Sequence, residues 1–527
     1  MKRIKQFLKL ITKPDLACFK LFIIGALTCF IFAPYYFFAL GFICYSYLAY
    51  RIYFIKNLRS AYQQIFYFFL GFYLSNFYWI SFSFLVNADF KLLFPLAFII
   101  IPLYLALFSA AFFLLLSYIR QKYQLSKLGF YYLFCLCLIM HELLRANFVP
   151  LIDLKGLPWN LLGYSYFTNL NLAQIADFIG VNGLTILAGF LFPLFFLLFT
   201  LELKATVIIA IIFSIITAGQ HLYGSKKLAT YSDNNSSLQA NLKLLHLNNK
   251  THISADPELV LANLDEAIAI LNADLAANKD DILILPEGLI SVLGTSDYNE
   301  AIEYILASLE RPYAYLIIGA PRAEQNSYYY NFYNSLFVID SQGNYLNYYD
   351  KVNLVPFGEY NPYLNIIPSL ATNAGFSKGL EQNKIIELAN VKFVPLICYD
   401  AIFSGKFSAT GDLLLNITND IWFTRKIYGK NISLGPWQHL DHTRMRAIEE
   451  GKPLIRVANY GISAVIDSVG QISKQQGFYD AESLLSAKLP AKLEQQTIFN
   501  QYRDLFTQIF ILLNFLCFFC FLSGIRT

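Results

Sequence analysis

An apolar run that ends on a thiol and a carboxylate stands at Val394-Pro395-Leu396-Ile397-Cys398-Tyr399-Asp400. A short, continuous apolar run of this kind is typical of a strand that is buried on both faces of a sheet. Around it, from 242 to 490, β-rich runs alternate with helical stretches. This alternation predicts an α/β domain in which sheets are covered by helices. Strands are expected at 242–247, 281–285, 315–319, 334–340, 393–398, 413–416, 454–459 and 463–467, and helices at 257–274, 298–310 and 436–451.

The composition of the chain as a whole is that of a membrane protein. Of the 527 residues, 56% are hydrophobic and 14% are charged, whereas a soluble domain has roughly 45–50% apolar and 25% charged residues. These values exclude a simply soluble protein and a disordered chain, and the net charge of +4 gives no indication of nucleic-acid binding. Because about 20 apolar residues span a bilayer, we expect an α-helical membrane bundle of about eight transmembrane helices. The expected spans are 15–33, 35–50, 61–81, 92–118, 128–148, 180–200, 204–222 and 506–525.

The distribution of Lys and Arg orients this bundle. Five such residues precede the first span, three lie between the second and third spans, and three lie between the fourth and fifth spans. The alternate connections hold fewer: none between the first and second spans, one between the third and fourth, and two at the end of the fifth span and in the loop that follows it. By the positive-inside rule, both termini are cytoplasmic. A bundle at 1–224 and a last helix at 506–527 then enclose an extramembrane domain at 225–505, which in a bacterium lies on the periplasmic side of the inner membrane. The polar stretch 225–237 is expected to be its linker.

Cysteine usage singles out one residue of the extramembrane domain. Seven of the eight cysteines fall within the expected spans, where we interpret them as small packing residues. Cys398 is the only cysteine of the domain at 225–505, so it cannot form a disulfide within that domain. It is therefore either buried and inert or retained for its reactivity.

Two charged residues accompany this thiol at expected strand ends, where functional groups of α/β proteins collect. Glu287 follows the apolar run Leu283-Ile284-Leu285, and Lys351 precedes a second carboxylate, Glu359. Taken singly, such a Glu is usually a solvated carboxylate, such a Lys a surface charge and such a Cys a core residue. Together they supply the base, cation and nucleophile that covalent acyl transfer requires. A partly desolvated carboxylate can take the thiol proton, and an ammonium with a backbone N–H, such as that of Tyr399, can stabilise the oxyanion.

In this order and context, Glu287, Lys351 and Cys398 resemble the Glu-Lys-Cys triad of the nitrilase, or carbon–nitrogen hydrolase, superfamily. The flanking spans narrow the resemblance to its membrane-anchored branch, the bacterial apolipoprotein N-acyltransferases. Similar motifs occur at 351–360, 397–400, 418–423, 435–439, 444–449 and 459–464, and in the membrane part at 71–81, 158–165 and 180–183.

The resemblance implies a fold and a two-step reaction. The inserted domain would be an α-β-β-α sandwich. Cys398 would take an acyl chain from a phospholipid as a thioester and pass it to the α-amine of a diacylglyceryl-cysteine at the N-terminus of an apolipoprotein. Glu287 would act as general base and acid, Lys351 would steady the oxyanion, and Glu359, Tyr399 and Asp400 would shape the site. The resemblance implies no metal and no cofactor, and we expect a monomer.

The sequence departs from the usual family pattern at four places. Asp400 replaces a usual Glu, so a backbone shift or a water would have to recover the reach of the lost methylene if this carboxylate supports the site. The segment 247–253 lacks the family's Gln-Gly-Asn run and its tryptophan. Thr424 stands where Gly is usual, and 425–432 is a longer loop.

Other polar residues have open interpretations. His439 and His442 share one face of an expected helix and could bind a metal, but hydrogen bonding near the pocket or in the core is favoured because no third ligand is evident. The group of His141, Glu142 and Arg145 is either functional or a pair that stabilises the bundle. The arginines 444, 446 and 456 could attract phosphate headgroups or form structural ion pairs.

Two other functions remain alternatives. A membrane-tethered amidase would use the same triad with water as the acceptor. A transporter or receptor would use the nitrilase-like domain only for binding, but charged or Gly/Pro-broken segments at mid-membrane depth are scarce.

Overall fold

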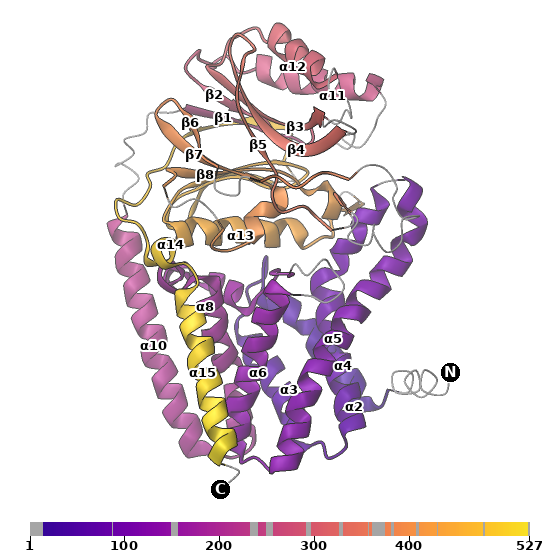
Figure 1. Cartoon of the computed structure of the whole chain (residues 1–527), viewed down its shortest axis with the longest axis vertical. Coiled ribbons are helices and arrows are strands. Elements are labelled where there is room, and N and C mark those ends of the chain that lie inside the picture. Colours follow the sequence, from indigo (N-terminus) through magenta and orange to yellow (C-terminus); the bar gives the residue numbers. More distant parts are fainter. Residues whose placement is uncertain are drawn as a thin grey trace.

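The protein consists of a helical bundle with an α/β domain stacked on one end, as the computed structural model in Figure 1 shows. The structure describes residues 14–86, 88–148, 156–231, 241–248, 257–290, 297–325, 330–356, 358–360, 375–380, 384–406, 410–428, 430–477 and 480–524. The chain enters the α/β domain after helix α10 (Leu203–Thr230) and returns to the bundle through helix α15 (Leu505–Gly524). The α/β domain is thus inserted between two helices of the bundle.

The bundle is built from apolar helices, and all of them except the four-residue helix Leu170–Ala173 overlap the expected spans. They are α2 (Leu16–Leu27), α3 (Ala39–Phe54), α4 (Leu58–Phe77), α5 (Phe94–Tyr123), α6 (Lys127–Asn147), α7 (Leu170–Ala173), α8 (Ala176–Leu191), α9 (Phe195–Phe199), α10 and α15. Within the described ranges, five helical segments are long and apolar enough to cross a membrane: Leu58–Leu85, Lys91–Tyr123, Lys127–Asn147, Ala176–Phe199 and Leu203–Thr230. By this measure the count is five and not eight, because α2 and α3 have only 12 and 16 residues and Leu505–Asn514 of α15 is short.

Two helix boundaries differ from the sequence-based expectation for local reasons. The second helix begins at Ala39 instead of 35, because the chain turns just before it and Tyr36 adopts a φ of 54°. Helix α10 continues to Thr230, so the expected polar linker begins inside a helix. An ion pair of 2.7 Å between Lys227 Nζ and Asp177 Oδ2 stabilises this last part of α10. Residues 232–237 of the expected linker lie outside the described residues.

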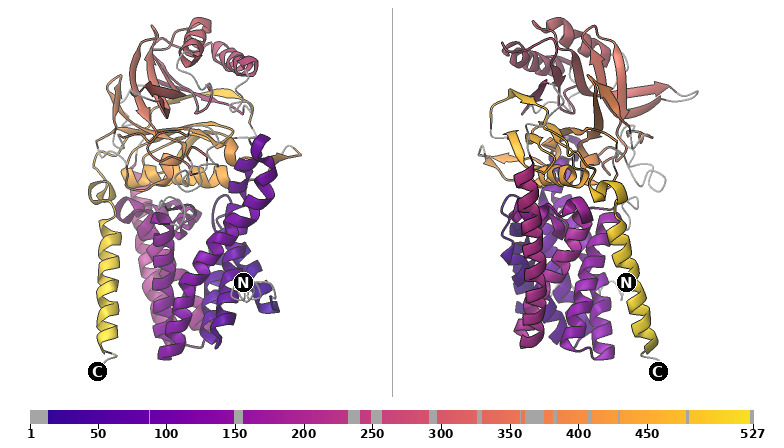
Figure 2. Two further views of the ribbon diagram at one scale, coloured as in Figure 1. Left: turned by 45° about the vertical axis from the view of Figure 1, so that its right-hand side comes forward. Right: turned by 90° about the vertical axis from the view of Figure 1, so that its left-hand side faces the viewer.

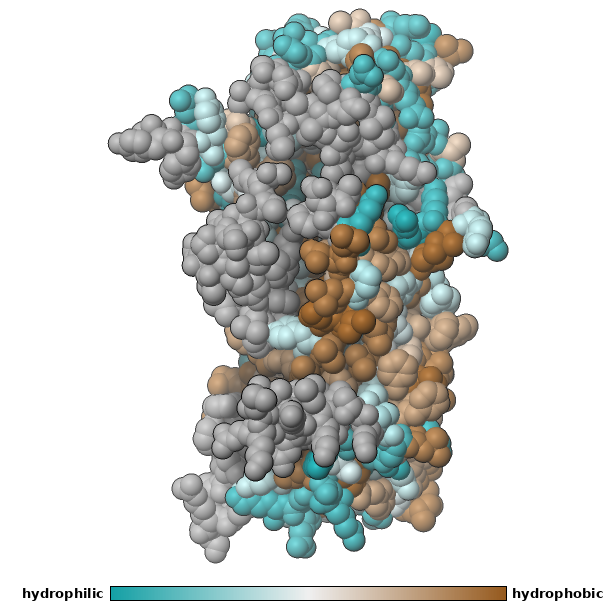
Figure 3. All heavy atoms as spheres, turned by 90° about the vertical axis from the view of Figure 1, so that its right-hand side faces the viewer, coloured by the Kyte–Doolittle hydropathy of each residue, from teal (hydrophilic) through white to brown (hydrophobic). Residues whose placement is uncertain are grey.

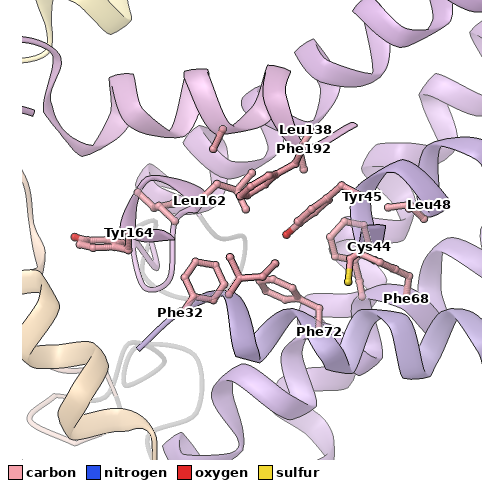
Figure 4. Close-up of a cluster of buried hydrophobic side chains, with 14 of the residues drawn as sticks. Phe32, Cys44, Tyr45, Leu48, Phe68, Phe72, Leu138, Leu162, Tyr164 and Phe192 are labelled. Carbon is pink, nitrogen blue, oxygen red and sulfur yellow. The ribbon is translucent and has the colours of Figure 1, made fainter. Parts of the chain in front are cut away.

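Aromatic side chains fill the centre of the bundle. Figure 4 shows Phe32, Tyr45, Phe72 and Phe192 converging from different segments. The rings of Tyr45 and Phe192 stack with centroids 5.8 Å apart and an interplanar angle of 6°. Such offset ring pairs add about 0.5–1.5 kcal/mol beyond area burial, and they account for the unusual aromatic content of this part of the sequence.

Gly180 allows helix α8 to approach the returning chain. Its φ of 66° lies in the left-handed region, and a Cβ atom there would stand 2.3 Å from Cε2 of Phe499 on helix α14 (Ile498–Tyr502). Only glycine combines this backbone conformation with this contact. The residue therefore fixes the packing of the segment that leads out of the α/β domain.

The described part of the α/β domain contains two six-stranded sheets. The first has the order β14-β1-β2-β3-β4-β5 and the second the order β13-β12-β11-β8-β7-β6. Their strands are β1 (Asn241–His246), β2 (Ile282–Ile284), β3 (Tyr315–Gln325), β4 (Tyr330–Asp340), β5 (Tyr345–Asp350), β6 (Ile386–Leu388), β7 (Val391–Ile397), β8 (Leu413–Asn419), β11 (Leu454–Asn459), β12 (Ser463–Ile466), β13 (Ile472–Gln476) and β14 (Ser483–Lys488). A small hairpin of β9 (Lys426–Ile427) and β10 (Lys430–Asn431) stands apart from both.

The two sheets face each other and carry helices on their outer sides. Leu244 and Ile317 of the first sheet share one buried cluster with Ile397 and Ile417 of the second. Helices α11 (Pro257–Asn272) and α12 (Asp297–Ser308) cover the first sheet, and α13 (Gly435–Glu450) covers the second. The described part of the domain is therefore a four-layered α-β-β-α sandwich, as expected.

The hydrophobic packing on the outer face of the second sheet is continuous with that of the bundle. Ile402, Phe423, Met445 and Ile448 belong to the same buried cluster as the bundle's aromatic centre, and α13 lies directly on the bundle (Figure 1). Figure 2 shows α15 running along the bundle away from the α/β domain. Figure 3 shows hydrophobic side chains gathered in a band at the level of the bundle, with hydrophilic side chains beyond it at both ends. The chain is a membrane protein whose α/β domain adjoins one edge of this apolar band.

Candidate active site

Cys398 comes directly after strand β7, at the start of a single 3₁₀ turn (Cys398–Ile402). Its φ is 47°, in the left-handed region, and its side chain is buried. A non-glycine residue held in this region stores of the order of 1–3 kcal/mol of strain. The strain identifies Cys398 as a residue whose backbone the surrounding contacts must hold in place.

Glu287 lies beyond the end of β2, and main-chain and side-chain donors orient its carboxylate. Its Oε2 accepts a hydrogen bond of 2.9 Å from the backbone N–H of Asn419, and its Oε1 accepts one of 2.8 Å from Nδ2 of Asn334. Asn419 ends β8 of the second sheet, whereas Asn334 belongs to β4 of the first sheet. The carboxylate therefore bridges the two sheets.

Lys351 follows β5 and is enclosed by two carboxylates. Its Nζ lies 2.8 Å from Oε1 of Glu359 and 3.7 Å from Oε1 of Glu287. Glu359 is fixed in turn by the backbone N–H of Val355 at 2.7 Å and by Nδ2 of Asn334 at 2.7 Å. Sequence reasoning missed Asn334, although a polar residue at the start of an otherwise apolar expected strand was the available signal.

The electrostatics of the site favour a neutral thiol beside a base. Burial raises the pKa of Cys398, and the charge of Glu287 raises it further, while Lys351 opposes this. Burial also raises the pKa of Glu287, and Lys351 opposes that shift too. For Lys351, burial alone would lower the pKa, but Glu359 and Glu287 outweigh it and raise the pKa above its ordinary range. The thiol is thus protonated at neutral pH, next to a carboxylate of increased basicity and a permanent cation.

Asp400 ties the 3₁₀ turn of Cys398 to the segment that carries Lys351. Its Oδ2 accepts hydrogen bonds from the hydroxyl of Tyr349 at 3.0 Å and from the backbone N–H of Ile397 at 3.1 Å. Its Oδ1 accepts from the backbone N–H of Asn353 at 2.9 Å and from that residue's Nδ2 at 3.0 Å. Asp400 makes all four contacts directly, so the shorter side chain reaches its partners. Between Cys398 and Asp400, Tyr399 packs against the buried cluster that joins the bundle to the α/β domain.

Comparison with known proteins gives a consistent result over the whole chain. The apolipoprotein N-acyltransferase N-terminal domain family matches residues 24–192, and the carbon-nitrogen hydrolase family matches residues 244–499. An apolipoprotein N-acyltransferase of Rickettsia prowazekii is 31% identical over 506 residues, which cover 93% of this chain and 96% of the relative. The chain belongs to the apolipoprotein N-acyltransferase family.

A second apolipoprotein N-acyltransferase, from Rhodopseudomonas palustris, is 32% identical over 457 residues, with 83% of this chain and 81% of the relative covered. Among solved structures, an amidase from Nesterenkonia sp. is 20% identical and covers 51% of this chain and 97% of its own, with a TM-score of 0.35. The family resemblance expected from the motifs is confirmed by the full-length relatives, and the protein is an acyltransferase.

In this acyltransferase, the two histidines of α13 hydrogen-bond to protein groups. His439 Nδ1 lies 3.0 Å from Oδ1 of Asp420, and His439 Nε2 lies 3.3 Å from the carbonyl oxygen of Cys398. His442 Nδ1 lies 2.5 Å from the hydroxyl of Tyr164, which belongs to the bundle. These contacts agree with the hydrogen-bonding interpretation of the pair.

The arginines of the acyltransferase that could have attracted phosphate form ion pairs. Arg444 lies 3.1 Å from Asp441, Arg446 lies 2.9 Å from Glu449, and Arg456 lies 2.7 Å from Asp420. Arg446 and Arg456 are fully buried, so their role is structural.

Arg145 of the bundle orders the segment that carries Trp159. Its Nη1 donates to the carbonyl oxygens of Leu157 at 2.9 Å and Trp159 at 2.7 Å, and its Nη2 donates to Glu142 at 2.8 Å. The ring of Trp159 then lies against His439, with centroids 5.5 Å apart. These contacts favour the stabilising interpretation of the polar group on α6.

The departures from the family pattern have distinct surroundings. Thr424 Oγ1 lies 2.8 Å from the carbonyl oxygen of Asp420 and 2.9 Å from that of Tyr460, so it joins two loops of the second sheet. The longer loop at 425–432 contains the β9–β10 hairpin, and the hydroxyl of Tyr78 donates to the carbonyl of Ile432. Most of the segment 247–253 lies outside the described residues.

Proposed function

We propose that this enzyme moves an acyl chain from a phospholipid to the N-terminal amine of a diacylglyceryl-cysteine in an apolipoprotein, through a thioester on Cys398. The observation that carries the proposal is the position of the nucleophile beside the bundle. Tyr399, the next residue along the chain, packs against the buried cluster that joins the bundle to the α/β domain, and the charges of Glu287 and Lys351, from the other sheet, act on Cys398. A base, a cation and a thiol therefore meet where lipid substrates arrive.

In the first proposed step, sulfur of Cys398 attacks the ester carbonyl carbon of the phospholipid as Glu287 accepts the thiol proton. Lys351 and the backbone N–H of Tyr399 stabilise the oxyanion. The carbon–oxygen ester bond then breaks, Glu287 returns the proton to the leaving alkoxide, and a lysophospholipid departs. The raised pKa of Glu287 suits both halves of this exchange, because a carboxylate with a pKa nearer neutrality accepts and returns a proton efficiently.

In the second proposed step, the lipoprotein's neutral α-amine attacks the thioester carbon. The carbon–sulfur bond breaks, and Glu287 takes a proton from the attacking nitrogen and delivers it to the leaving sulfur, which regenerates the thiol and the carboxylate. Glu359 and Asp400 touch neither reactant; they hold Lys351 and the 3₁₀ turn of Cys398 in place. The cycle needs neither metal nor cofactor.

The location of the site reduces the cost of handling lipids. Removing an acyl chain from a bilayer costs about 0.8 kcal/mol per CH₂, or on the order of 12 kcal/mol for a common chain. A site beside the bundle lets both lipid-anchored substrates keep most of their chains in an apolar environment. The position of the site is therefore better suited to acyl transfer between two lipid-anchored substrates than to hydrolysis of a soluble amide.

We further propose that α2, α3 and α15 also span the membrane, which gives eight spans in the inner membrane of a bacterium. An even number of spans leaves both termini on one side of the membrane and the domain at 225–505, between the bundle at 1–224 and the helix at 506–527, on the other. The Lys and Arg distribution supports cytoplasmic termini and a periplasmic domain. The end of α10 and the start of α15 both adjoin the α/β domain (Figure 1), which supports the insertion. We expect one chain to suffice for activity.

The proposal is tested with a phospholipid that carries a labelled acyl chain. The purified protein should form a covalent acyl adduct that mass spectrometry maps to Cys398. The adduct should be absent in Cys398→Ala and present in Cys137→Ala, a matched control that removes a thiol of the bundle. An adduct that survives Cys398→Ala would contradict the assignment of the nucleophile. Addition of a diacylated lipopeptide should give N-acylated peptide, whereas free fatty acid as the sole product would support an amidase or hydrolase instead.

A further inference from the structure

His439 contacts the main chain of the nucleophile and not its side chain. Its Nε2 lies 3.3 Å from the carbonyl oxygen of Cys398. Because a carbonyl oxygen can only accept, Nε2 must carry a hydrogen and donate it. Burial and Arg456 lower the pKa of His439, while Asp420 raises it. The hydrogen on Nε2 is required whatever the state of Nδ1, which lies 3.0 Å from Oδ1 of Asp420 and 3.1 Å from Nη2 of Arg456.

A buried network holds the ring in place. Nδ1 of His439 lies 3.1 Å from Nη2 of Arg456 and 3.0 Å from Oδ1 of Asp420, and Nη2 of Arg456 donates to Oδ2 of Asp420 at 2.7 Å. Nη1 of Arg456 donates to Asn416 at 2.6 Å. The rings of Trp159 and Phe423 contact the imidazole with centroids 5.5 and 5.7 Å away. Hydrogen bonds and ring contacts thus hold the direction in which Nε2 donates.

The bond to the Cys398 carbonyl determines where the next N–H points. The carbonyl of Cys398 and the N–H of Tyr399 belong to one planar peptide unit, in which the trans geometry directs them to opposite sides. Cys398 also has a left-handed φ of 47°, a conformation that needs external support. If this peptide rotated, a carbonyl oxygen would replace the N–H, and it would repel an oxyanion instead of stabilising it.

We propose that His439 is a positioning residue that holds the Cys398–Tyr399 peptide in the orientation that offers the Tyr399 N–H to the oxyanion. The inference rests on the proposed function, because it requires acylation of Cys398. His439 then affects the chemistry through the peptide, and neither touches substrate nor takes part in proton transfer. Arg456 and Asp420, which both contact the second nitrogen, hold the ring in the position from which Nε2 donates.

Three substitutions separate this role from general packing. His439→Gln retains an N–H donor whose reach is similar to that of Nε2. His439→Asn retains the same amide chemistry but is too short to reach the Cys398 carbonyl. His439→Leu removes the donor and keeps an apolar volume. For each purified variant, thermal unfolding is measured together with two rates: formation of the Cys398 acyl adduct from labelled phospholipid and alkylation of Cys398 by iodoacetamide.

The two reactions differ in whether an oxyanion forms. An oxyanion develops during acylation, whereas alkylation forms a carbon–sulfur bond as iodide leaves and develops none. We expect acylation to fall about 10- to 100-fold in His439→Asn and His439→Leu, somewhat less than the loss of an oxyanion donor itself. His439→Gln should stay within a few-fold of the wild-type rate. Alkylation should change little in all three variants.

Any of three results would overturn the inference: equal loss of both reactions, no loss of acylation in His439→Asn, or a Gln variant as slow as the Asn variant. If His439→Leu does not fold, the Gln–Asn comparison alone decides between these outcomes. Acylation that persists in Cys398→Ala would instead overturn the proposed function, so the two failures are distinguishable.

Discussion

Replacement of Lys351 by methionine should reveal how strongly this cation controls the base. Lys351 Nζ lies 3.7 Å from Oε1 of Glu287. At an effective dielectric constant of about 20, two unit charges at this separation attract by about 4 kcal/mol. Since about 1.4 kcal/mol is a factor of ten in a protonation equilibrium, Lys351 favours the carboxylate form of Glu287 by about 10³. Burial and Glu359 both raise the pKa of Glu287 and Lys351 opposes them, so Lys351→Met must raise that pKa further.

The consequence is visible in the pH dependence of acylation. The proposed mechanism requires the carboxylate form of Glu287, so the acid limb of the profile should move to higher pH in Lys351→Met. The plateau should also fall about 10²- to 10³-fold through loss of an oxyanion donor. Single-turnover acylation by labelled phospholipid, followed across the pH range, measures both effects. Lys351→Arg retains the charge and should leave the acid limb near its wild-type position. An acid limb that stays in place, or moves to lower pH, in Lys351→Met would refute this reasoning.

Three further predictions concern the neighbours of the site and the junction with the bundle. Glu359→Gln removes a charge that raises the pKa of Glu287, so the same profile should shift to lower pH, and a shift to higher pH would contradict this. Asp400→Asn replaces an acceptor of four hydrogen bonds and turns an amide toward a buried N–H donor, which should cost about 1–3 kcal/mol and lower the unfolding temperature in detergent; an unchanged temperature would count against the assigned contacts. Gly180→Ala should destabilise the fold by about 2–4 kcal/mol through its backbone conformation and its collision with Phe499. Gly219→Ala, which has open space around it, should leave the unfolding temperature unchanged.

The buried strands could be predicted from sequence, but the edge strands could not. β7 contains the apolar run 393–397 and β8 begins with the apolar run 413–415, so their burial in the middle of a sheet could be predicted from local composition. Strands β5, β6, β13 and β14 have no such run; β13, for example, has three exposed residues out of five. Their conformation is set by pairing with a neighbouring strand, a tertiary interaction that local composition does not encode.

The boundary of α10 illustrates the same limit. The polar composition after 224 indicated a linker, yet the helix continues to Thr230. Lys227 reaches Asp177, which lies 50 positions earlier in the chain, and this long-range ion pair overrides the local signal. The boundary between the bundle and the α/β domain therefore could not be placed from the sequence to better than one or two helical turns.

For the candidate site, the residue types could be predicted from the sequence, but their contacts could not. Glu287, Lys351 and Cys398 were predicted as a triad because their residue types and order resemble a known one. The groups that orient them were not: Asn419 binds Glu287 across 132 positions through its backbone N–H, which any residue type could supply. His439 was noticed only as half of a possible metal pair, whereas its contact is with the main chain of Cys398.

The central claim is that Cys398 carries the acyl group between two lipid substrates. The most direct measurement is a single-turnover chase, in which protein first acylated by labelled phospholipid is separated from donor and mixed with diacylated lipopeptide. The account predicts that the Cys398 thioester disappears at the rate at which N-acylated peptide appears, with one acyl group transferred for each thioester lost. A thioester that persists while N-acylated peptide forms from added phospholipid would contradict it.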